Sequence, residues 1–228
     1  AMVAKTVSRE FRVGNPTPRM AETEVGIIQS IGLPGNGIKY FLDEMLPEYK
    51  KYKPPLVVSI SAETEDDFAA MARDISVPGV DVVEVNISCP TRDPTGGNFA
   101  LQTRHTENVI RGIRAETEKP VWAKLSPNAG DIVSVALAAE EGGADAAKFQ
   151  SYKADTIASK HSPAYWDTAQ EPTQSQHELF KKYDQFEPED YLNLAEYCNK
   201  TKIDFLSTPF DDQAIEFLYP LMPFYKIA

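Results

Sequence analysis

Short apolar runs rich in β-branched residues alternate along this chain with stretches of helical pattern, and this alternation is what most constrains the fold. The runs, which we predict to be strands, are Val3–Ser8, Leu56–Ser61, Val82–Ser88, Val121–Leu125, Ala146–Gln150, Asp204–Ser207 and Tyr225–Ala228. The predicted helices are Asn36–Tyr49, Thr64–Ile75, Thr106–Thr117, Asp131–Glu141, Glu187–Asn199 and Asp211–Tyr219. Several runs are apolar on both faces, as in a parallel sheet that is covered on both sides. The alternation therefore predicts parallel βαβ units.

We predict an α/β fold of the TIM (βα)8-barrel type, with residues 1–228 forming a single domain. The predicted strands are one short of a closed eight-stranded barrel, so the barrel is either one strand short or completed by a partner. An open doubly wound sheet is the structural alternative. Two stretches interrupt the alternation of strands and helices. Arg9–Pro34 is expected to form a hairpin over the barrel mouth. Ser151–Gln185 is expected to form a long polar, lid-like loop with a short helix near Ser175–Tyr183.

The overall charge limits the classes of partner. A net charge of −11 argues against nucleic acid and anionic membrane, because both bind a basic face. No run approaches the roughly 18 apolar residues of a membrane helix, and the N-terminus has no signal-peptide pattern. Cys89 and Cys198 are too few for a disulfide framework, so a cytoplasmic protein is expected.

Polar residues occupy the predicted strands near their carboxyl ends, where a parallel barrel forms its active site. They are Lys5, Thr6, Ser59, Ser61, Glu84, Asn86, Ser88, Cys89, Lys124, Ser126, Lys148, Gln150, Ser207, Thr208 and Lys226. Lysines within strands are unusual, because burying an unpaired ammonium group is costly. If these lysines face inward, they form a positive pocket for a phosphate, a carboxylate or a reduced flavin. Alternatively, Glu84 pairs with one lysine and water reaches the others.

Two further residue types carry chemistry. The Cys89 thiol directly follows a predicted strand, and it is either a base or nucleophile with a lowered pKa or an inert, half-buried group. His105, His161 and His177 lack metal-ligand spacing, so no metal site is predicted.

Ordered motifs in the first part of the chain are Gly14-Asn15-Pro16-Thr17-Pro18-Arg19, Ser30-Ile31-Gly32-Leu33-Pro34, Glu84-Val85-Asn86-Ile87-Ser88-Cys89-Pro90 and Lys124-Leu125-Ser126-Pro127-Asn128. Through them, residues 3–145 resemble class 1 dihydroorotate dehydrogenases, the soluble, cysteine-dependent class. The resemblance implies a TIM barrel that binds FMN over its mouth and oxidises dihydroorotate.

The resemblance also implies roles for individual residues. Lys5, Thr6, Asn86 and Lys124 would contact the flavin. Cys89 would take the proton from substrate C5 while hydride leaves C6 for flavin N5. Gln29 and Thr91 stand where the family often has Asn, and both departures weaken orotate binding.

Different motifs follow Gly143, namely Lys148-Phe149-Gln150-Ser151-Tyr152-Lys153-Ala154, Phe205-Leu206-Ser207-Thr208-Pro209-Phe210 and Phe224-Tyr225-Lys226-Ile227-Ala228. Residues 143–228 resemble the N-acetylneuraminate (sialic acid) synthase family, another TIM barrel, which condenses phosphoenolpyruvate with an N-acetyl amino sugar on a divalent metal. The resemblance implies that Lys148, Gln150, Thr208 and Lys226 contact phosphoenolpyruvate. We therefore divide the domain into a dihydroorotate dehydrogenase-like part, residues 1–145, and a sialic acid synthase-like part, residues 146–228.

Each resemblance leaves out part of its family's site, namely the glycine-rich loops that hold the FMN phosphate and the histidines that hold the metal. Because catalysis needs a complete, preorganised set of groups, we expect a recombined or engineered chimeric barrel without evolved catalytic activity. Cys89 would then be a vestigial base. No cofactor is expected to be bound, FMN being the candidate if any, and the mouth would at most weakly hold a small anion or flavin.

Two alternatives remain open. One is an FMN-dependent dihydroorotate dehydrogenase-like oxidoreductase. The other is a module that forms homo-oligomers through an unpaired strand at the edge of the sheet.

Overall fold

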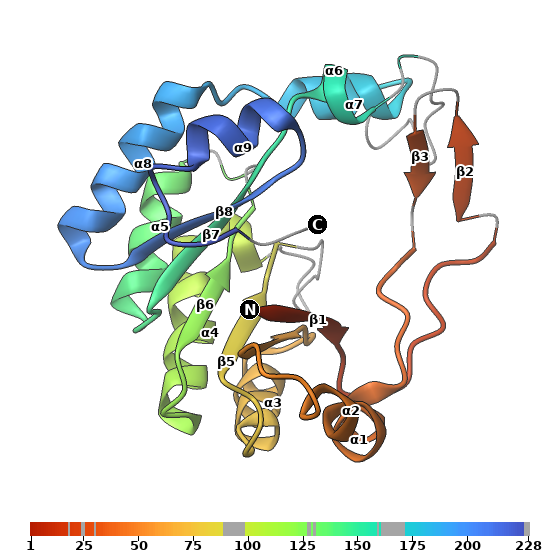
Figure 1. Cartoon of the computed structure of the whole chain (residues 1–228), viewed down its shortest axis with the longest axis vertical. Helices are drawn as coiled ribbons and strands as arrows, with labels where there is room; N and C mark the ends of the chain where they lie inside the picture. The colour runs from red at the N-terminus through yellow and green to blue at the C-terminus, as the bar shows by residue number, and fades with distance from the viewer. Residues whose placement is uncertain are drawn as a thin grey trace.

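The main body of the protein is a curled parallel sheet (Figure 1). The computed structural model describes residues 1–17, 19–23, 26–29, 31–88, 99–126, 129, 131–158, 160 and 172–225. Within these residues six strands lie in the order β1-β4-β5-β6-β7-β8, and every neighbouring pair is parallel. Their bounds are Met2–Val7 (β1), Leu56–Ile60 (β4), Val82–Asn86 (β5), Val121–Lys124 (β6), Ala146–Ser151 (β7) and Asp204–Pro209 (β8).

These strands confirm the predicted TIM-barrel-type α/β fold, but the sheet is a half-barrel and not a nearly closed one. In the part of the chain that the structure describes, β1 and β8 each have a strand neighbour on one side only. The strand predicted at Tyr225–Ala228 does not begin at Tyr225, which lies in irregular backbone, and residues 226–228 are outside the described residues.

Strands β6 and β7 are direct hydrogen-bonded neighbours, with Trp122 opposite Ala146 and Lys124 opposite Lys148. Asp145 reinforces this junction at the start of β7. Its amide donates to Val121 O at 2.8 Å, and its carboxylate accepts from Val121 N at 2.8 Å. The two halves of the sequence therefore share one continuous sheet.

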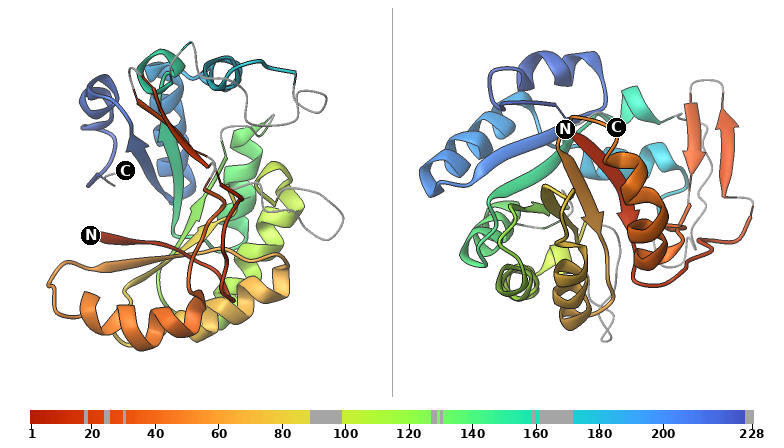
Figure 2. Two further views of the ribbon diagram at one scale, coloured as in Figure 1. Left: turned by 90° about the vertical axis from the view of Figure 1, so that its right-hand side faces the viewer. Right: turned by 60° about the horizontal axis from the view of Figure 1, so that its bottom comes forward.

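Helices cover the outer face of the sheet (Figure 2). They are α3 (Glu65–Ile75), α4 (Thr103–Glu116), α5 (Ile132–Glu141), α8 (Pro188–Thr201) and α9 (Asp212–Leu218), with a 3-10 turn η2 (Phe99–Leu101) before α4. The predicted cap of α3 is confirmed, because the Thr64 side chain accepts from Asp67 N at 3.1 Å. Buried apolar side chains between helices and strands, including Phe68, Ile110 and Phe149, form the main core.

The helix predicted at Asn36–Tyr49 is one continuous helical segment with a wider turn inside it. It consists of α1 (Gly37–Tyr40), a π-helical turn η1 (Phe41–Met45) and α2 (Leu46–Tyr49). Pro47 near the start of α2 has no backbone N–H to donate, so the regular i→i−4 ladder cannot run through this position.

The inner face of the sheet carries a second, smaller cluster. Val57, Trp122, Ala146 and Leu206 are buried together there, and Met222 packs against them. Ser207 N donates to Met222 Sδ at 3.2 Å. Phe224 stacks on Trp122 with ring centroids 5.5 Å apart, so the segment after α9 fills part of the hollow of the half-barrel.

Two further segments lie beside the sheet. The expected hairpin is present as antiparallel β2 (Met20–Thr23) and β3 (Gly26–Gln29), and it projects away from the six-stranded sheet (Figure 1). The short helices α6 (Ala154–Ile157) and α7 (Gln176–Tyr183) follow β7. Among the helices of the described residues, none has both the length and the apolar content needed to cross a bilayer.

Candidate functional site

A chain of hydrogen bonds joins the carboxyl ends of three neighbouring strands. Asn86 Nδ2 of β5 donates to Thr6 Oγ1 of β1 at 3.0 Å, and Thr6 Oγ1 lies 3.0 Å from Ser59 Oγ of β4. Ser88, just after β5, donates to Asn86 Oδ1 at 3.0 Å. We call Thr6, Ser59, Asn86 and Ser88 the strand-end chain. Because Ser59 and Asn86 are buried, the chain holds the Asn86 amide in one orientation at the mouth of the half-barrel.

The two lysines that the family resemblance assigns to a flavin lie on either side of this strand-end chain. Lys124 is the register partner of Asn86 on β6, and its side chain is half-buried. Lys5 is on the edge strand β1, directly before Thr6, and its side chain is exposed. Strand pairing therefore brings Thr6, Asn86 and Lys124 to one end of the sheet, with Lys5 at its margin.

Lys148 has a different environment. Its Nζ lies 2.9 Å from Glu84 Oε2, and both side chains are less than 5% exposed, at 3% for Lys148 and 4% for Glu84. The angles at Glu84 Oε2 are not those of a hydrogen bond with any described group, so the contact is an ion pair held by distance and charge. Lys148 lies on β7 and Glu84 on β5, so the lysine side chain reaches across β6.

This pair matches one of the two alternatives for the strand lysines, in which Glu84 pairs with one lysine. Desolvation explains the pairing, since a buried ammonium group is tolerated only with a counter-ion. The contact of Lys148 with phosphoenolpyruvate stays a prediction.

The other residues assigned to phosphoenolpyruvate are only partly brought together. Thr208 on β8 is buried and is the register partner of Gln150 on β7, which is half-buried. The Gln150 carbonyl accepts from the Tyr191 hydroxyl at 3.1 Å, and burial raises the pKa of Tyr191 to about 12. Lys226 lies outside the described residues.

The remaining candidates are accounted for as follows. Cys89 and His161 lie outside the described residues. His105 Nδ1 lies 2.9 Å from Glu65 Oε1, and His177 Nε2 lies 2.9 Å from Asp155 Oδ1. Within the described part of the chain, no group of three or more His, Cys, Asp or Glu side chains is arranged to hold a metal ion.

Sequence reasoning missed a network next to the mouth, where Lys153 and Asp184 tie the end of β7 to the segment before α8. Lys153 Nζ donates to Asp184 O at 3.1 Å and to Phe186 O at 2.8 Å, and it pairs with Glu187. Asp184 in turn accepts from Ala154 N at 2.7 Å. The partners are some thirty residues apart in the chain, and no local pattern signals such a contact.

Comparisons with known proteins agree with both resemblances. Residues 1–159 match the dihydroorotate dehydrogenase family, and residues 134–228 match the NeuB family. These matches confirm a dihydroorotate dehydrogenase-like part and a sialic acid synthase-like part, and they overlap around the predicted division at residue 145.

Curated relatives carry the name dihydroorotate dehydrogenase B (NAD(+)), catalytic subunit. The protein from Desulforudis audaxviator is 44% identical over 147 residues, and the one from Thermoanaerobacter sp. strain X514 is 39% identical over 146 residues. Each alignment covers 64% of this chain and 48% of the relative, so the chain spans about half the length of the curated relatives it matches.

Among solved structures, the carboxyl transferase domain of Rhizobium etli pyruvate carboxylase with 3-hydroxypyruvate has a TM-score of 0.38 and 12% identity. The superposition covers 80% of this chain and 28% of that chain, and a likeness this weak carries no argument.

The relatives correct one expectation. A recombined or engineered barrel without evolved catalytic activity is contradicted, because the matched relatives are named as catalytic subunits. The physical features point the same way, since the strand-end chain keeps its hydrogen bonds at the end of the sheet where barrel enzymes bind their substrates.

Proposed function

This chain belongs to the dihydroorotate dehydrogenase family, and we propose that it acts as an FMN-dependent oxidoreductase on dihydroorotate. The observation that carries the proposal is the strand-end chain next to Lys124, at the carboxyl ends of β1, β4, β5 and β6. We also propose a cytoplasmic location and small anions as ligands, with neither nucleic acid nor membrane as a partner, in keeping with the net charge of −11.

The residues present fit the ring end of FMN. A flavin ring offers carbonyl oxygens and ring nitrogens along its polar edge, which call for amide, hydroxyl and ammonium donors. Asn86, Thr6 and Lys124 supply these donor types from β5, β1 and β6 at one end of the sheet, and Lys5 adds a second ammonium group at the margin. Bound in this way, FMN would supply the hydride acceptor of the reaction.

The side chains of this chain have distinct tasks in the proposed reaction. The strand-end chain orients the Asn86 amide, so that its position does not have to be organised when the ligand binds. Lys124 places positive charge beside that amide and stabilises negative charge on a bound ring or carboxylate. Cys89, the residue that follows Ser88 in the sequence, would take the proton from the substrate carbon.

The proposal is tested by flavin binding and by turnover. The protein is titrated with FMN and followed by visible absorption and flavin fluorescence, and dihydroorotate oxidation is measured with an artificial electron acceptor. We expect K124M to weaken FMN binding by at least about tenfold, because a charge-assisted contact is lost. The matched control is K200M, which removes a lysine near the end of α8, on the outer face of the sheet.

A second variant separates binding from chemistry. C89A is expected to bind FMN like the unaltered chain and to lose turnover by at least about a hundredfold, because a general base contributes on that order. The proposal is overturned if the unaltered chain binds no FMN, or if K124M and K200M bind it equally well.

A further inference from the structure

Two rows of side chains cross the inner face of the sheet. Glu84 and its register partner Trp122 lie in the lower row. Asn86, Lys124 and Lys148 are opposite one another in the upper row, two residues nearer the carboxyl ends of their strands. Residues two apart along a strand share a face of the sheet, so the two rows lie one above the other. The upper row therefore combines two residues of the proposed flavin site with a lysine from the part of the chain after residue 145.

The buried ion pair runs from the upper row to the lower row. Lys148 Nζ lies 2.9 Å from Glu84 Oε2, and the side chains are 3% and 4% exposed. Neighbouring strands lie about 4.8 Å apart. Lys148 on β7 starts two strands away from Glu84 on β5, whereas Lys124 on β6 starts only one strand away. The ion pair of Glu84 in the described part of the chain is therefore made with the more distant of these two lysines.

This choice of partner affects the charge at the mouth. A buried carboxylate is stable only with a counter-ion, so Glu84 would attract the nearest ammonium group if Lys148 did not neutralise it. Lys124 is the lysine on the neighbouring strand, and pairing with Glu84 would draw its ammonium group from the upper row toward the lower row. The charge would then move away from the Asn86 amide, beside which the proposed flavin ring binds.

We propose that Glu84 and Lys148 are positioning residues of the flavin site, whose ion pair keeps the Lys124 ammonium group at the mouth. The inference rests on the proposed binding of FMN. It gives the sialic acid synthase-like part of the chain a task in the dihydroorotate dehydrogenase-like site. Because the pair is neutral as a whole, removal of one charge alters the mouth, whereas removal of both leaves its net charge unchanged.

The test compares the affinities of the chain for oxidised and for reduced FMN, the latter measured without oxygen in the presence of dithionite. Reduced FMN carries an additional negative charge on its ring at neutral pH, so the ratio of the two affinities reports the charge around the ring. Both forms of FMN bind the folded chain, and the ratio of their affinities therefore does not depend on the fraction of chain that is folded.

The two single variants should change this ratio in opposite directions. We expect K148M to lower the affinity for reduced relative to oxidised FMN by at least about threefold, because Lys124 turns toward Glu84. We expect E84Q to raise the same ratio by at least about threefold, because the Lys148 charge is no longer neutralised. Loss of structure alone would not give shifts of opposite sign.

The matched control is K119M, which removes a half-buried lysine two residues before β6, at the amino end of the sheet. Lys119 Nζ donates to Val80 O at 2.6 Å, so this variant also loses a structural contact. Its ratio should equal that of the unaltered chain, because the lost charge lies at the opposite end of the sheet.

The double variant E84L/K148M decides the matter even if a single variant does not fold. It should bind oxidised FMN within about threefold of the unaltered chain, because Lys124 then has no buried carboxylate to approach. A loss of at least about tenfold would mean that Lys148 contacts the ligand directly, and would overturn the positioning role.

The remaining outcomes separate this inference from the proposed function. If the unaltered chain binds FMN but the ratios of K148M and E84Q stay unchanged or shift in the same direction, the positioning role is wrong and the flavin site stands. If the unaltered chain binds neither form of FMN, both proposals fail.

Discussion

At the scale of single residues, the buried pair of Glu84 and Lys148 is the contact with the largest expected energetic effect. Two ions taken out of water lose the favourable free energy of hydration, and only their attraction for each other offsets that loss. Lys148 Nζ and Glu84 Oε2 lie 2.9 Å apart, and both side chains are almost fully buried. Each charge is therefore stabilised mainly by its partner. Because Glu84 precedes residue 145 and Lys148 follows it, the pair also joins the two parts of the sequence.

Neutralising Glu84 should therefore destabilise the protein strongly. We expect E84Q to lower the free energy of unfolding by about 3–5 kcal/mol, since Lys148 is left charged and buried without a counter-ion. Urea denaturation followed by far-UV circular dichroism measures the loss.

The matched control is E63Q, which removes a glutamate whose side chain is 73% exposed and which pairs with Arg12. Its effect should stay within about 0.5 kcal/mol, as for most surface ion pairs. The double variant E84L/K148M should recover most of the stability lost in E84Q. Equal effects of E84Q and E63Q would show that the buried pair contributes no more than a surface pair.

Cys198 gives a prediction about pH. Burial raises the pKa of its thiol from 9.0 to about 11, so the unfolded chain releases this proton first as the pH rises. The stability contributed by the neutral thiol is complete below pH 9 and is lost between about pH 9 and 11, by up to roughly 2–3 kcal/mol.

This loss is measured as the difference in unfolding free energy between pH 8 and pH 10, with C198A as the comparison. The unaltered chain should lose more stability over this interval than C198A does. In a C89S background, the native protein should also react slowly with a thiol reagent at pH 8. If the unfolding free energy falls equally with pH in the unaltered chain and in C198A, the loss of stability does not come from the Cys198 thiol.

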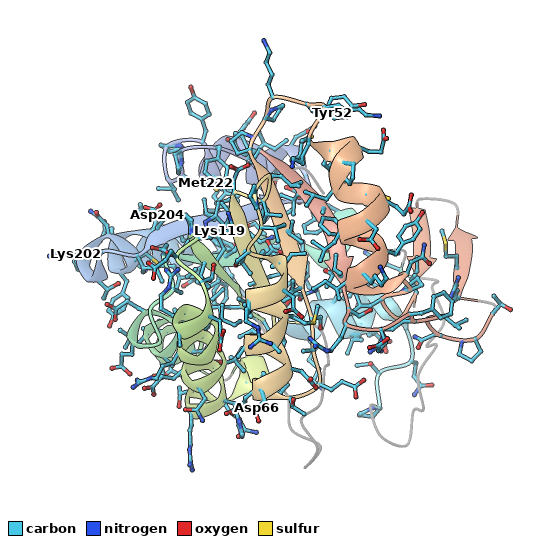
Figure 3. The ribbon with its side chains drawn as sticks, turned by 90° about the horizontal axis from the view of Figure 1, so that it is seen from below. Tyr52, Asp66, Lys119, Lys202, Asp204 and Met222 are labelled. Atoms are coloured by element: carbon cyan, nitrogen blue, oxygen red, sulfur yellow. The ribbon has the colours of Figure 1, made fainter. Side chains whose placement is uncertain are left out.

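At the scale of elements, α8 shows how local chemistry sets the end of a helix. Its carboxyl-terminal cap is Lys202, whose φ of 63° lies in the left-handed region. Lys202 lies at the outer tip of the connection from α8 to β8 (Figure 3). A non-glycine residue in this conformation is strained, whereas glycine adopts it freely.

Substituting glycine at this cap should stabilise the protein. We expect K202G to raise the free energy of unfolding by about 0.5–1 kcal/mol, because the backbone strain disappears. K200G, two residues earlier inside the helix, should instead lower it by about 1 kcal/mol. Thermal denaturation of the two variants in parallel is the measurement, and a shift of the same sign in both would contradict the role of the cap.

At the scale of the whole molecule, the continuous sheet joins sequences that match two different families. Strands β6 and β7 pair over Trp122 to Lys124 and Ala146 to Lys148, and β8 continues the sheet. The main core also draws buried side chains from both parts, including Phe68 and Phe205. Such shared packing favours cooperative unfolding.

We therefore expect one unfolding transition for the entire chain. Far-UV circular dichroism, which reports on the helices, and tryptophan fluorescence, which reports on Trp122 among others, should give the same midpoint in urea. Two transitions with separate midpoints would mean that the parts before and after residue 145 form independent cores.

The predictions from sequence succeeded where the signal is local. Each strand of the six-stranded sheet was placed by a short apolar run, and the cap of α3 by Thr64 and Asp67, because burial pattern and capping depend on neighbours in the chain. The same locality brought Thr6, Asn86 and Lys124 to one end of the sheet, since parallel strands end at the same edge. The π-helical turn before Pro47 was not predicted, because its hydrogen-bond pattern is compatible with the same apolar spacing.

The sequence by itself determined the order of strands and helices and the end of the sheet at which the polar residues gather. Only the tertiary structure decided that the sheet remains a half-barrel in its described part, and that Lys148 is paired with Glu84. Both depend on contacts between segments far apart in the chain. Curvature of a sheet and the reach of a side chain across a strand are set by packing, which periodicity along one strand does not encode.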